Sequence, residues 1–293
     1  MTAGEFSDSA LVLLGHGSTL NAESGAPTYQ HADALRARGI FAEVHEAFWK
    51  LEPSISGVLR GVRSKRIFCV PLFISEGYFT EEVLPRELGL CGKGETVFPR
   101  IQLKEGRTVH YCRPVGTHDS MTEVLLARAR DVVASHPFPY APRPADITVF
   151  IAGHGTGNNE NSRKIIERQV ELIAARKEYA AVHAIFMEED PRIGECYALA
   201  QTRHVVMVPF FISDGLHSYE DIPMMLGEPE SVVRARLAAR QPTWRNPTER
   251  KGKLIWYSAS IGTEPHIPEV ILERVREMST ESPVPSAANS EGA

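Results

Sequence analysis

The run VFIAGHGTG at Val149–Gly157 is a second version of the run LVLLGHGST at Leu11–Thr19, and the two lie 138 residues apart. The same offset relates VPFFISDG at Val208–Gly215 to VPLFISEG at Val70–Gly77. Over residues 11–85, 21 of 75 positions carry the same amino acid as the position 138 residues later. An ungapped internal repeat of this length indicates two tandem copies of one domain.

The repeat also divides the chain. Past residue 85 the offset becomes 146, because Gly116-Thr117 matches Gly262-Thr263, so the second copy carries about eight extra residues within Gly227–Lys253. Between the copies lies HPFPYAPRPAD, whose four prolines in eleven residues predict an extended linker. The predicted division is a disordered tail at 1–9, an N-terminal domain at 10–135, a Pro-rich linker at 136–146, a C-terminal domain at 147–278 and a disordered tail at 279–293.

Composition excludes several classes of protein. Of the 293 residues, 43% are hydrophobic and 24% are charged, which is typical of a globular protein. The net charge of −5 disfavours nucleic acid as a partner, because phosphate neutralisation needs a basic face. No apolar run approaches the ~20 residues that a membrane helix needs, and Met1–Ser9 lacks the basic start of a signal peptide. Four scattered cysteines without a CxxC pair argue against a zinc ribbon or a disulfide framework and predict a cytoplasmic location.

Each copy alternates between predicted strands and helices, which is typical of a parallel sheet covered on both faces. We therefore expect an α/β fold of two tandem similar domains. In the second copy the predicted strands are Ile147–Ala152, Ala181–Met187, His204–Ile212 and Leu254–Ser258, and the predicted helices are Asn161–Glu178, Pro191–Gln201, Ile222–Leu226 and Ile267–Met278. Ligands of such sheets bind beyond the carboxyl ends of the strands.

Three residues of the second copy follow three different strands. His154 follows the first strand between two glycines, Glu188 closes the second, and His217 lies in the loop after the third. Two imidazoles and a carboxylate are able to bind a divalent transition metal and to move protons near neutral pH. Taken singly, each residue also fits a simpler role: a structural turn, a solvated acid and a surface loop residue. Their shared position at one edge of one sheet favours the functional interpretation.

The first copy provides an internal comparison. His16 matches His154, but Lys50 stands where the second copy has Glu188, and Phe79 stands where it has His217. The chain therefore contains one half with the full set of groups and one degenerate half.

Nucleotide chemistry has no support in the sequence, since neither a P-loop nor a G-x-G-x-x-G motif after a strand is present. The GHGS and GHGT turns also lack the spacing of a nucleophile elbow. The segment Gly157–Arg163 opens a predicted helix, and helix N-termini attract anions. Carboxylates of a ligand are therefore expected near Ser162, Arg163 and Lys164, although an exposed polar helix start fits the same residues.

The GHG turn, the acid after the second strand and the run VPFFISDGLHSYEDIP resemble the CbiX-type sirohydrochlorin chelatases over both copies. The resemblance implies the class II chelatase fold, with two α/β domains facing each other across a cleft. It implies ATP-independent insertion of Co²⁺, Fe²⁺ or Ni²⁺ into a sirohydrochlorin-like tetrapyrrole. The family's two metal-site histidines map onto His154 and His217, and its acid maps onto Glu188, with Glu189 as a competitor. Two features depart from the family: GLH where many relatives have GYH, and the stretch Gly92–Gly106.

The resemblance also implies the partners. The metal ion is a substrate and no cofactor is permanently bound. The tetrapyrrole is expected between the copies, near His16 and Phe79 and in contact with Tyr78 or Leu216, and a monomer suffices. Because that ligand carries many carboxylates, basic residues are expected to line the cleft, with Lys50, Arg163, Lys164 and Arg192 as candidates. The alternatives are a non-catalytic metal or tetrapyrrole carrier on the same fold and, third, a hydrolase that uses the GHG turn.

Overall fold

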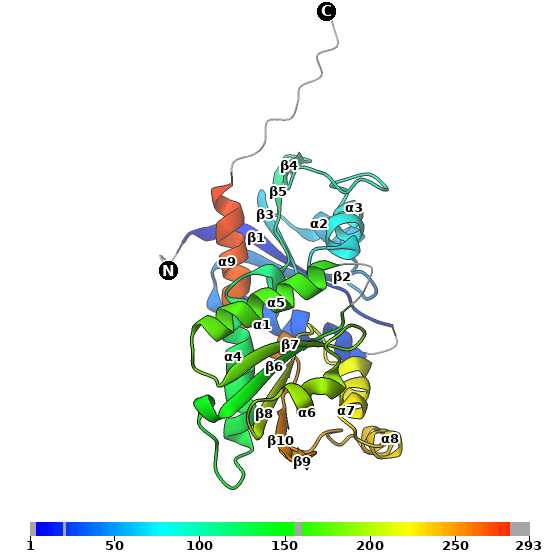
Figure 1. The fold of residues 1–293 in the computed structure, drawn as a ribbon. Helices are drawn as coiled ribbons and strands as arrows, with labels where there is room; N and C mark the ends of the chain where they lie inside the picture. Colours follow the sequence, from blue (N-terminus) through cyan, green and yellow to red (C-terminus); the bar gives the residue numbers. More distant parts are fainter. Residues whose placement is uncertain (1–3, 20–21, 156–159, 282–293) are drawn as a thin grey trace, which may run out of the picture.

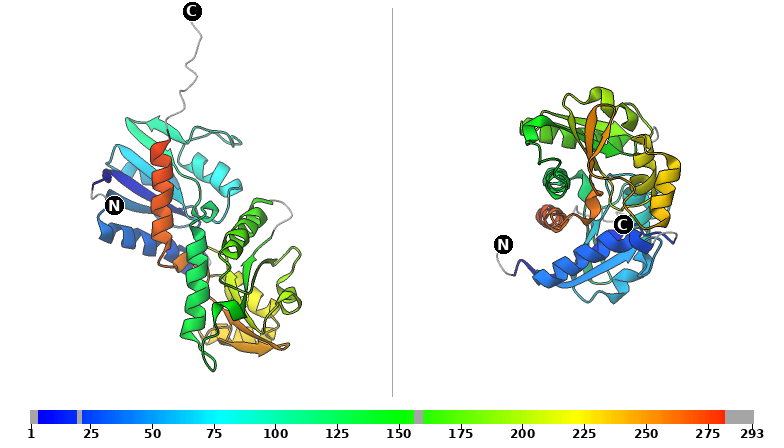
Figure 2. Two further views of the ribbon diagram at one scale, coloured as in Figure 1. Left: turned by 60° about the vertical axis from the view of Figure 1, so that its left-hand side comes forward. Right: turned by 90° about the horizontal axis from the view of Figure 1, so that it is seen from below.

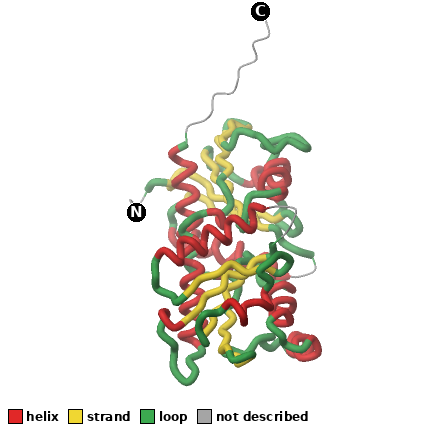
Figure 3. Tube along the Cα trace, viewed as in Figure 1, coloured by secondary structure: helices red, strands yellow, loops and turns green. Residues whose placement is uncertain are grey.

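The computed structural model describes residues 4–19, 22–155 and 160–281. They form two five-stranded sheets with the orders β2-β1-β3-β5-β4 and β7-β6-β8-β10-β9. Figure 1 shows the sheet of the first copy above that of the second, and Figure 3 shows helices beside both sheets. The predicted fold class, two tandem similar α/β domains, is confirmed.

The strands of the two sheets correspond one to one. They are β1 (Phe6–Gly15), β2 (Phe41–Phe48), β3 (Arg66–Pro71), β4 (Ile101–Lys104) and β5 (Arg107–Tyr111), then β6 (Ile147–Gly153), β7 (Ala181–Phe186), β8 (His204–Pro209), β9 (Thr248–Arg250) and β10 (Lys253–Tyr257). Four strands of each sheet are parallel, and β4 and β9 pair antiparallel at the edges. The sequence did not predict these two edge strands, because they are short and mostly polar.

Strands β1 and β6, each of which lies between two parallel neighbours, carry the GHG turns. All seven residues of β6 are buried, since helices cover both faces of the sheet. In the ladder, Phe150 of β6 lies between His183 of β7 and Met207 of β8. The strands therefore end at one edge of the sheet, and the segments that follow them lie near one another.

Nine α-helices lie within the described ranges, and none of them is long and apolar enough to cross a membrane. They are α1 (Ala26–Arg38), α2 (Ile55–Gly61), α3 (Leu84–Glu87), α4 (Met121–Ser135), α5 (Glu160–Ala175), α6 (Cys196–Leu199), α7 (Ile222–Met225), α8 (Glu230–Ala238) and α9 (Ile267–Thr280). The α8 helix lies in the segment where the second copy carries its extra residues. The helix predicted over Pro191–Gln201 is shorter in the structure, a 3₁₀ turn followed by α6.

The last helix of each copy packs on the sheet of the other copy. The α4 helix lies against β8 and β10, and α9 lies against β3 and β5. Figure 2 shows the two helices next to each other between the halves. Hydrogen bonds accompany the exchange: Arg274 Nε of α9 donates to Pro114 O at 3.1 Å, and Trp256 Nε1 of β10 donates to His136 O at 2.9 Å. Packing therefore crosses the domain bounds that the sequence suggests.

The chain ends differ from the predicted tails. Strand β1 begins at Phe6, whose buried ring stacks on Phe41 and meets Phe68 edge-on, with centroids 5.5 Å apart in both pairs. Burial of this ring holds residues 6–9 in the sheet, so the predicted tail at 1–9 is too long. At the other end α9 continues to Thr280, and most of the predicted tail, from residue 282, lies outside the described residues.

Candidate functional site

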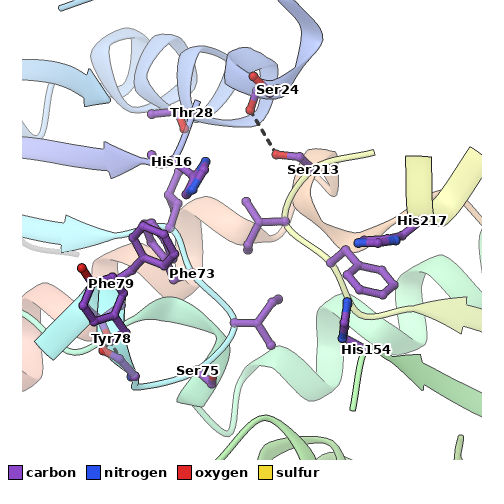
Figure 4. Close-up of a pocket in the computed structure, with 17 residues that line it drawn as sticks. His16, Ser24, Thr28, Phe73, Ser75, Tyr78, Phe79, His154, Ser213 and His217 are labelled. Atoms are coloured by element: carbon purple, nitrogen blue, oxygen red, sulfur yellow. Dashed lines mark hydrogen bonds between the residues drawn. The ribbon is translucent and has the colours of Figure 1, made fainter. Parts of the chain in front are cut away.

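The two glycines around His154 fix the turn after β6. A Cβ added at Gly153 would overlap Ile166 Cδ1 of α5, so a larger residue here would displace that side chain. Gly155 has a φ of +67°, a left-handed conformation that glycine adopts without strain. The turn directs the His154 side chain into the space between the halves, as Figure 4 shows.

Glu188 lies beside His154 because the segment that follows β7 continues to form hydrogen bonds with the GHG turn. Its backbone N–H donates to His154 O at 3.0 Å, and its Oε2 lies 3.7 Å from His154 Nδ1. Glu189, the competing acid, accepts a hydrogen bond from Arg163 Nη1 at 3.0 Å. The arrangement leaves Glu188, whose side chain is 59% exposed, as the carboxylate next to the histidine.

His217 begins a π-helix, His217–Asp221, that leads into α7. Its ring meets that of His154 edge-on, with centroids 5.0 Å apart. His217 Nδ1 lies 2.7 Å from Asp221 Oδ2, and a carboxylate oxygen accepts, so Nδ1 carries the proton. Short π-helical segments are frequent at functional sites.

The pair of imidazoles is able to hold a metal ion only loosely. His154 Nδ1 lies 3.3 Å from Gly155 O, so in both rings an oxygen occupies the Nδ1 side and the Nε2 lone pair remains for a ligand. Within the described ranges, no group of three or more His, Cys, Asp or Glu side chains is arranged to hold a metal ion. A two-imidazole site leaves most coordination positions of a divalent ion open to a second molecule.

In the first copy the corresponding place is an aromatic cluster. His16 lies with its ring centroid 4.9 Å from Phe79 and 5.2 Å from Trp49, and Phe73 stacks on Phe79 at 6.1 Å. Lys50 Nζ lies 4.6 Å from the centroid of the Trp49 ring. Phe79 thus places an apolar ring where the second copy has His217, so His16 has an aromatic neighbour where His154 has a second imidazole.

A cavity of about 670 Å³ separates the two clusters, and both line it. In Figure 4 the His154–His217 pair lies on one side, with His16, Phe73 and Phe79 opposite. A second cavity of about 690 Å³ shares His16 and His217 and extends to Leu216. Ser213 Oγ donates to Ser24 O at 3.0 Å and so links the halves beside the cavities. Most of the larger lining groups are apolar or aromatic, which suits a flat, largely apolar ligand.

The expectation of basic residues in the cleft is wrong for these two cavities. No described residue that lines them is Lys or Arg. Arg163 binds Glu189 and Glu167 instead, and Arg192 lies 3.4 Å from Asp190. Lys50 Nζ lies over the Trp49 ring. The predicted anion site at Gly157–Arg163 lies partly outside the described residues, since 156–159 are not described.

Cations do line a smaller neighbouring cavity of about 280 Å³ between the halves. Its polar lining comprises Glu76, Arg113, Thr117, Asn161, Lys164 and Arg274. Glu76 follows Ser75 and precedes Gly77, which both line the large cavity, so the two spaces are adjacent. Of the four candidate cations, Lys164 lines this smaller cavity, and none of the four lines the two larger ones.

Sequence reasoning missed two residues of the site. Trp49 was not singled out, although it follows the matched Phe48 and precedes Lys50. Asp221 was quoted only as part of a motif, although its i+4 spacing from His217 places the two side chains on one helix face. A comparison with the first copy, where Val83 occupies the same position, would have drawn attention to it.

Two copies of one α/β domain, with exchanged terminal helices and a histidine pair facing a cavity between the halves, define a protein of the class II chelatase type. A model of the CbiX family matches residues 10–132 and 148–278. The chain belongs to the CbiX family.

Individual relatives agree with this assignment. The chain is 42% identical over 275 residues to a probable sirohydrochlorin cobaltochelatase of Halobacterium salinarum, with 90% of each chain covered. The sirohydrochlorin cobaltochelatase of Methanopyrus kandleri is 29% identical over 142 residues, which is 45% of this chain and 96% of that protein. A short relative thus corresponds to about half of the tandem chain.

Solved structures show the same fold. A multi-domain protein of Deinococcus radiodurans, described as similar to chelatases and as having two additional domains, superposes with a TM-score of 0.75 at 32% identity. The match covers 92% of this chain and 55% of that one, so this chain spans about half of its length. The sirohydrochlorin chelatase SirB of Bacillus subtilis in complex with cobalt gives a TM-score of 0.58 at 17% identity, covering 92% of this chain and 94% of that one.

Proposed function

We propose that this protein inserts a divalent metal ion, preferably Co²⁺, into sirohydrochlorin without using a nucleotide. The observation that carries the proposal is the pair of imidazoles, His154 and His217, at 5.0 Å on one side of a cavity whose other side is aromatic. Family membership supports the reaction class. The relative that is 42% identical carries the name of a probable sirohydrochlorin cobaltochelatase, which supports the metal.

In the proposed mechanism, Nε2 of His154 and Nε2 of His217 hold the incoming ion while the macrocycle lies between the two clusters. Metallation forms bonds from the pyrrole nitrogens to the ion and releases two N–H protons. Glu188 is the proposed proton acceptor: it lies 3.7 Å from His154 Nδ1 and is exposed, so it passes protons to solvent. The ion leaves with the product because two protein ligands do not retain it against the macrocycle.

The aromatic cluster has a separate role in this proposal. The cavity wall opposite the two histidines carries the rings of Phe79, Phe73 and His16. In the proposal these rings contact the macrocycle and remove its apolar surface from water. Tyr78 at 61% exposure and Leu216 at 71% occupy equivalent positions of the two copies at the cavity walls. Such exposed apolar side chains are expected to be covered when the macrocycle binds.

An anaerobic absorbance assay with sirohydrochlorin tests the function. Purified protein, the macrocycle and Co²⁺, Fe²⁺ or Ni²⁺ are mixed without ATP, and formation of the metallated product is compared with the rate without protein. We expect acceleration with the highest kcat/KM for Co²⁺. Binding of the macrocycle without acceleration for any of the three ions would instead identify a carrier. A clear preference for Fe²⁺ or Ni²⁺ would refute the assigned metal and retain the chelatase.

Arg113→Ala is expected to weaken sirohydrochlorin binding without changing the chemical step. The large cavity lacks Lys and Arg among its described lining residues, so the peripheral carboxylates of the ligand have to extend outside it. Arg113 is 58% exposed at the adjacent cavity, 3.8 Å from Glu76. We expect KM for sirohydrochlorin to rise about three- to fivefold at unchanged kcat, because one exposed ion pair contributes up to ~1 kcal/mol.

The matched control for this variant is Arg143→Ala. Arg143 is also exposed and pairs with Asp146 at 2.8 Å, but it lies in the linker away from the three cavities described above. An equal rise in KM in both variants would show a general charge effect, and a loss of kcat in Arg113→Ala would place this residue elsewhere in the reaction.

A further inference from the structure

Asp221 is in contact with one of the two site histidines. Its Oδ2 lies 2.7 Å from His217 Nδ1, four residues earlier on the same π-helix. The carboxylate is half-buried, with 34% of the side chain exposed, and His217 is 49% exposed. A histidine that donates its Nδ1 proton to a carboxylate has a fixed tautomer and ring orientation, with the Nε2 lone pair directed away from that bond.

We propose that Asp221 is the positioning residue of the metal site: it holds His217 in the tautomer and orientation that offer Nε2 to the ion. The proposal rests on the function proposed above. It concerns a residue that acts through His217 and does not itself bind the ion or the macrocycle.

The first copy shows whether the π-helix needs the aspartate in order to fold. It has the same π-helix, Phe79–Val83, in which Phe79 replaces the histidine and Val83 replaces the aspartate. The backbone contacts are the same in both copies. Thr80 Oγ1 accepts from Gly77 N at 3.0 Å, as Ser218 Oγ accepts from Gly215 N at 3.0 Å.

The packing beneath the two π-helices also agrees. Tyr111 Oη donates to Thr80 O at 2.7 Å, and Tyr257 Oη donates to Ser218 O at 2.7 Å. A buried valine therefore serves this π-helix as well as an aspartate does, and the helix does not require the carboxylate. The first copy has neither the histidine nor the aspartate. We therefore infer that the role of Asp221 is its contact with the His217 ring.

The test measures Co²⁺ binding in the absence of sirohydrochlorin, by titration of the full-length protein followed through the visible absorption of the bound ion. Asp221→Val installs the residue of the first copy and is expected to weaken Co²⁺ binding about 10- to 100-fold, the usual effect of losing such a partner. Asp221→Asn keeps an oxygen acceptor, so its Co²⁺ affinity is expected to fall less than that of Asp221→Val. In turnover, KM for Co²⁺ is expected to rise more than kcat falls.

Glu220→Gln is the control, because Glu220 is the neighbouring acid on the same π-helix and lies near Arg234, 3.8 Å away. We expect its Co²⁺ affinity to equal that of the wild type. The ¹⁵N chemical shifts of His217 provide a second readout. In the wild type we expect the tautomer with the proton on Nδ1, and in Asp221→Val we expect a mixture of both tautomers.

The outcomes separate the two proposals. Wild-type Co²⁺ affinity in Asp221→Val, or an equal loss in Glu220→Gln, would overturn the positioning role alone. If His154→Ala and His217→Ala also bind and insert Co²⁺ as the wild type does, the proposed metal site itself is wrong.

Discussion

Replacing His154 by alanine is expected to slow the insertion of Co²⁺ into sirohydrochlorin by at least about 100-fold, whereas replacing His16 by alanine slows it only a few-fold. Both residues stand between two glycines after the first strand of their copy. His154 has a second imidazole at 5.0 Å and a carboxylate at 3.7 Å from its Nδ1. His16 instead has the rings of Phe79 at 4.9 Å and Trp49 at 5.2 Å, and Lys50 stands in the position of the carboxylate.

This pair of variants is informative because the two substitutions are structurally equivalent. Each removes a partly exposed imidazole from the same turn, so effects on folding should be similar and visible as equal melting temperatures. His217→Ala is expected to match His154→Ala, since either change leaves one imidazole. Equal losses in His16→Ala and His154→Ala would refute the asymmetry of the two halves, and a wild-type rate in His217→Ala would refute the site.

Gly262→Ala is expected to produce a large loss of stability next to the site, because Gly262 packs against Ile212, which lines the large cavity. Gly262 lies in a 3₁₀ turn after β10, and a Cβ at this position would overlap the carbonyl oxygen of Ile212. Backbone atoms do not move away as a flexible side chain does. Overpacking typically costs about 1–3 kcal/mol, and we expect the upper end here because the obstructing atom belongs to the backbone. At ~2.1 cal/mol/K per residue, 3 kcal/mol corresponds to a fall in melting temperature of roughly 5 °C for a chain of 293 residues.

The same substitution is also expected to disturb the site. Ile212 precedes Ser213, which bonds to Ser24 of the other half, and Gly262 O accepts a hydrogen bond from the buried His31 Nε2 at 2.6 Å. Burial lowers the pKa of His31, so the ring is neutral and donates through Nε2. A shift of this loop therefore loosens the contact between the halves, and Co²⁺ affinity is expected to fall with stability.

Gly61→Ala is the control, measured by thermal unfolding beside Gly262→Ala. Nothing lies within 4 Å of a Cβ added at Gly61, at the end of α2. We expect unchanged or slightly higher stability there, because alanine has less conformational freedom to lose than glycine. A melting temperature of Gly262→Ala within 2 °C of the wild type would contradict the close approach of the two backbones.

The parts of the fold that depend on local pattern were predictable from the sequence. The repeat identified two copies, the apolar runs identified the buried strands, and the strand ends placed His154 and His217 together. These inferences succeed because the residues of a parallel strand are buried on both faces and because the carboxyl ends of such strands meet at one edge.

The parts that depend on distant partners were not predictable. Arg163 looks like an anion ligand in the sequence, but it binds Glu189, 26 residues away. The sheet that α4 covers depends on the path of the chain after Ser135, which its amphipathic pattern does not reveal. The absence of described Lys and Arg residues from the walls of the two large cavities was missed for a related reason. The charge of a ligand indicates that cations are needed, but it does not indicate how far from the macrocycle they lie.

The exchange of α4 and α9 affects how the chain was able to diverge. Because each sheet is covered by a helix from the other copy, the two halves share one packed structure, and every molecule contains one of each. A mutation in one half is therefore not duplicated in the other, as it would be in a symmetric dimer of identical subunits. The contacts between the halves therefore constrain both copies, while the two cavity walls differ in their side chains. One wall is thus able to present an aromatic surface while the other keeps both imidazoles.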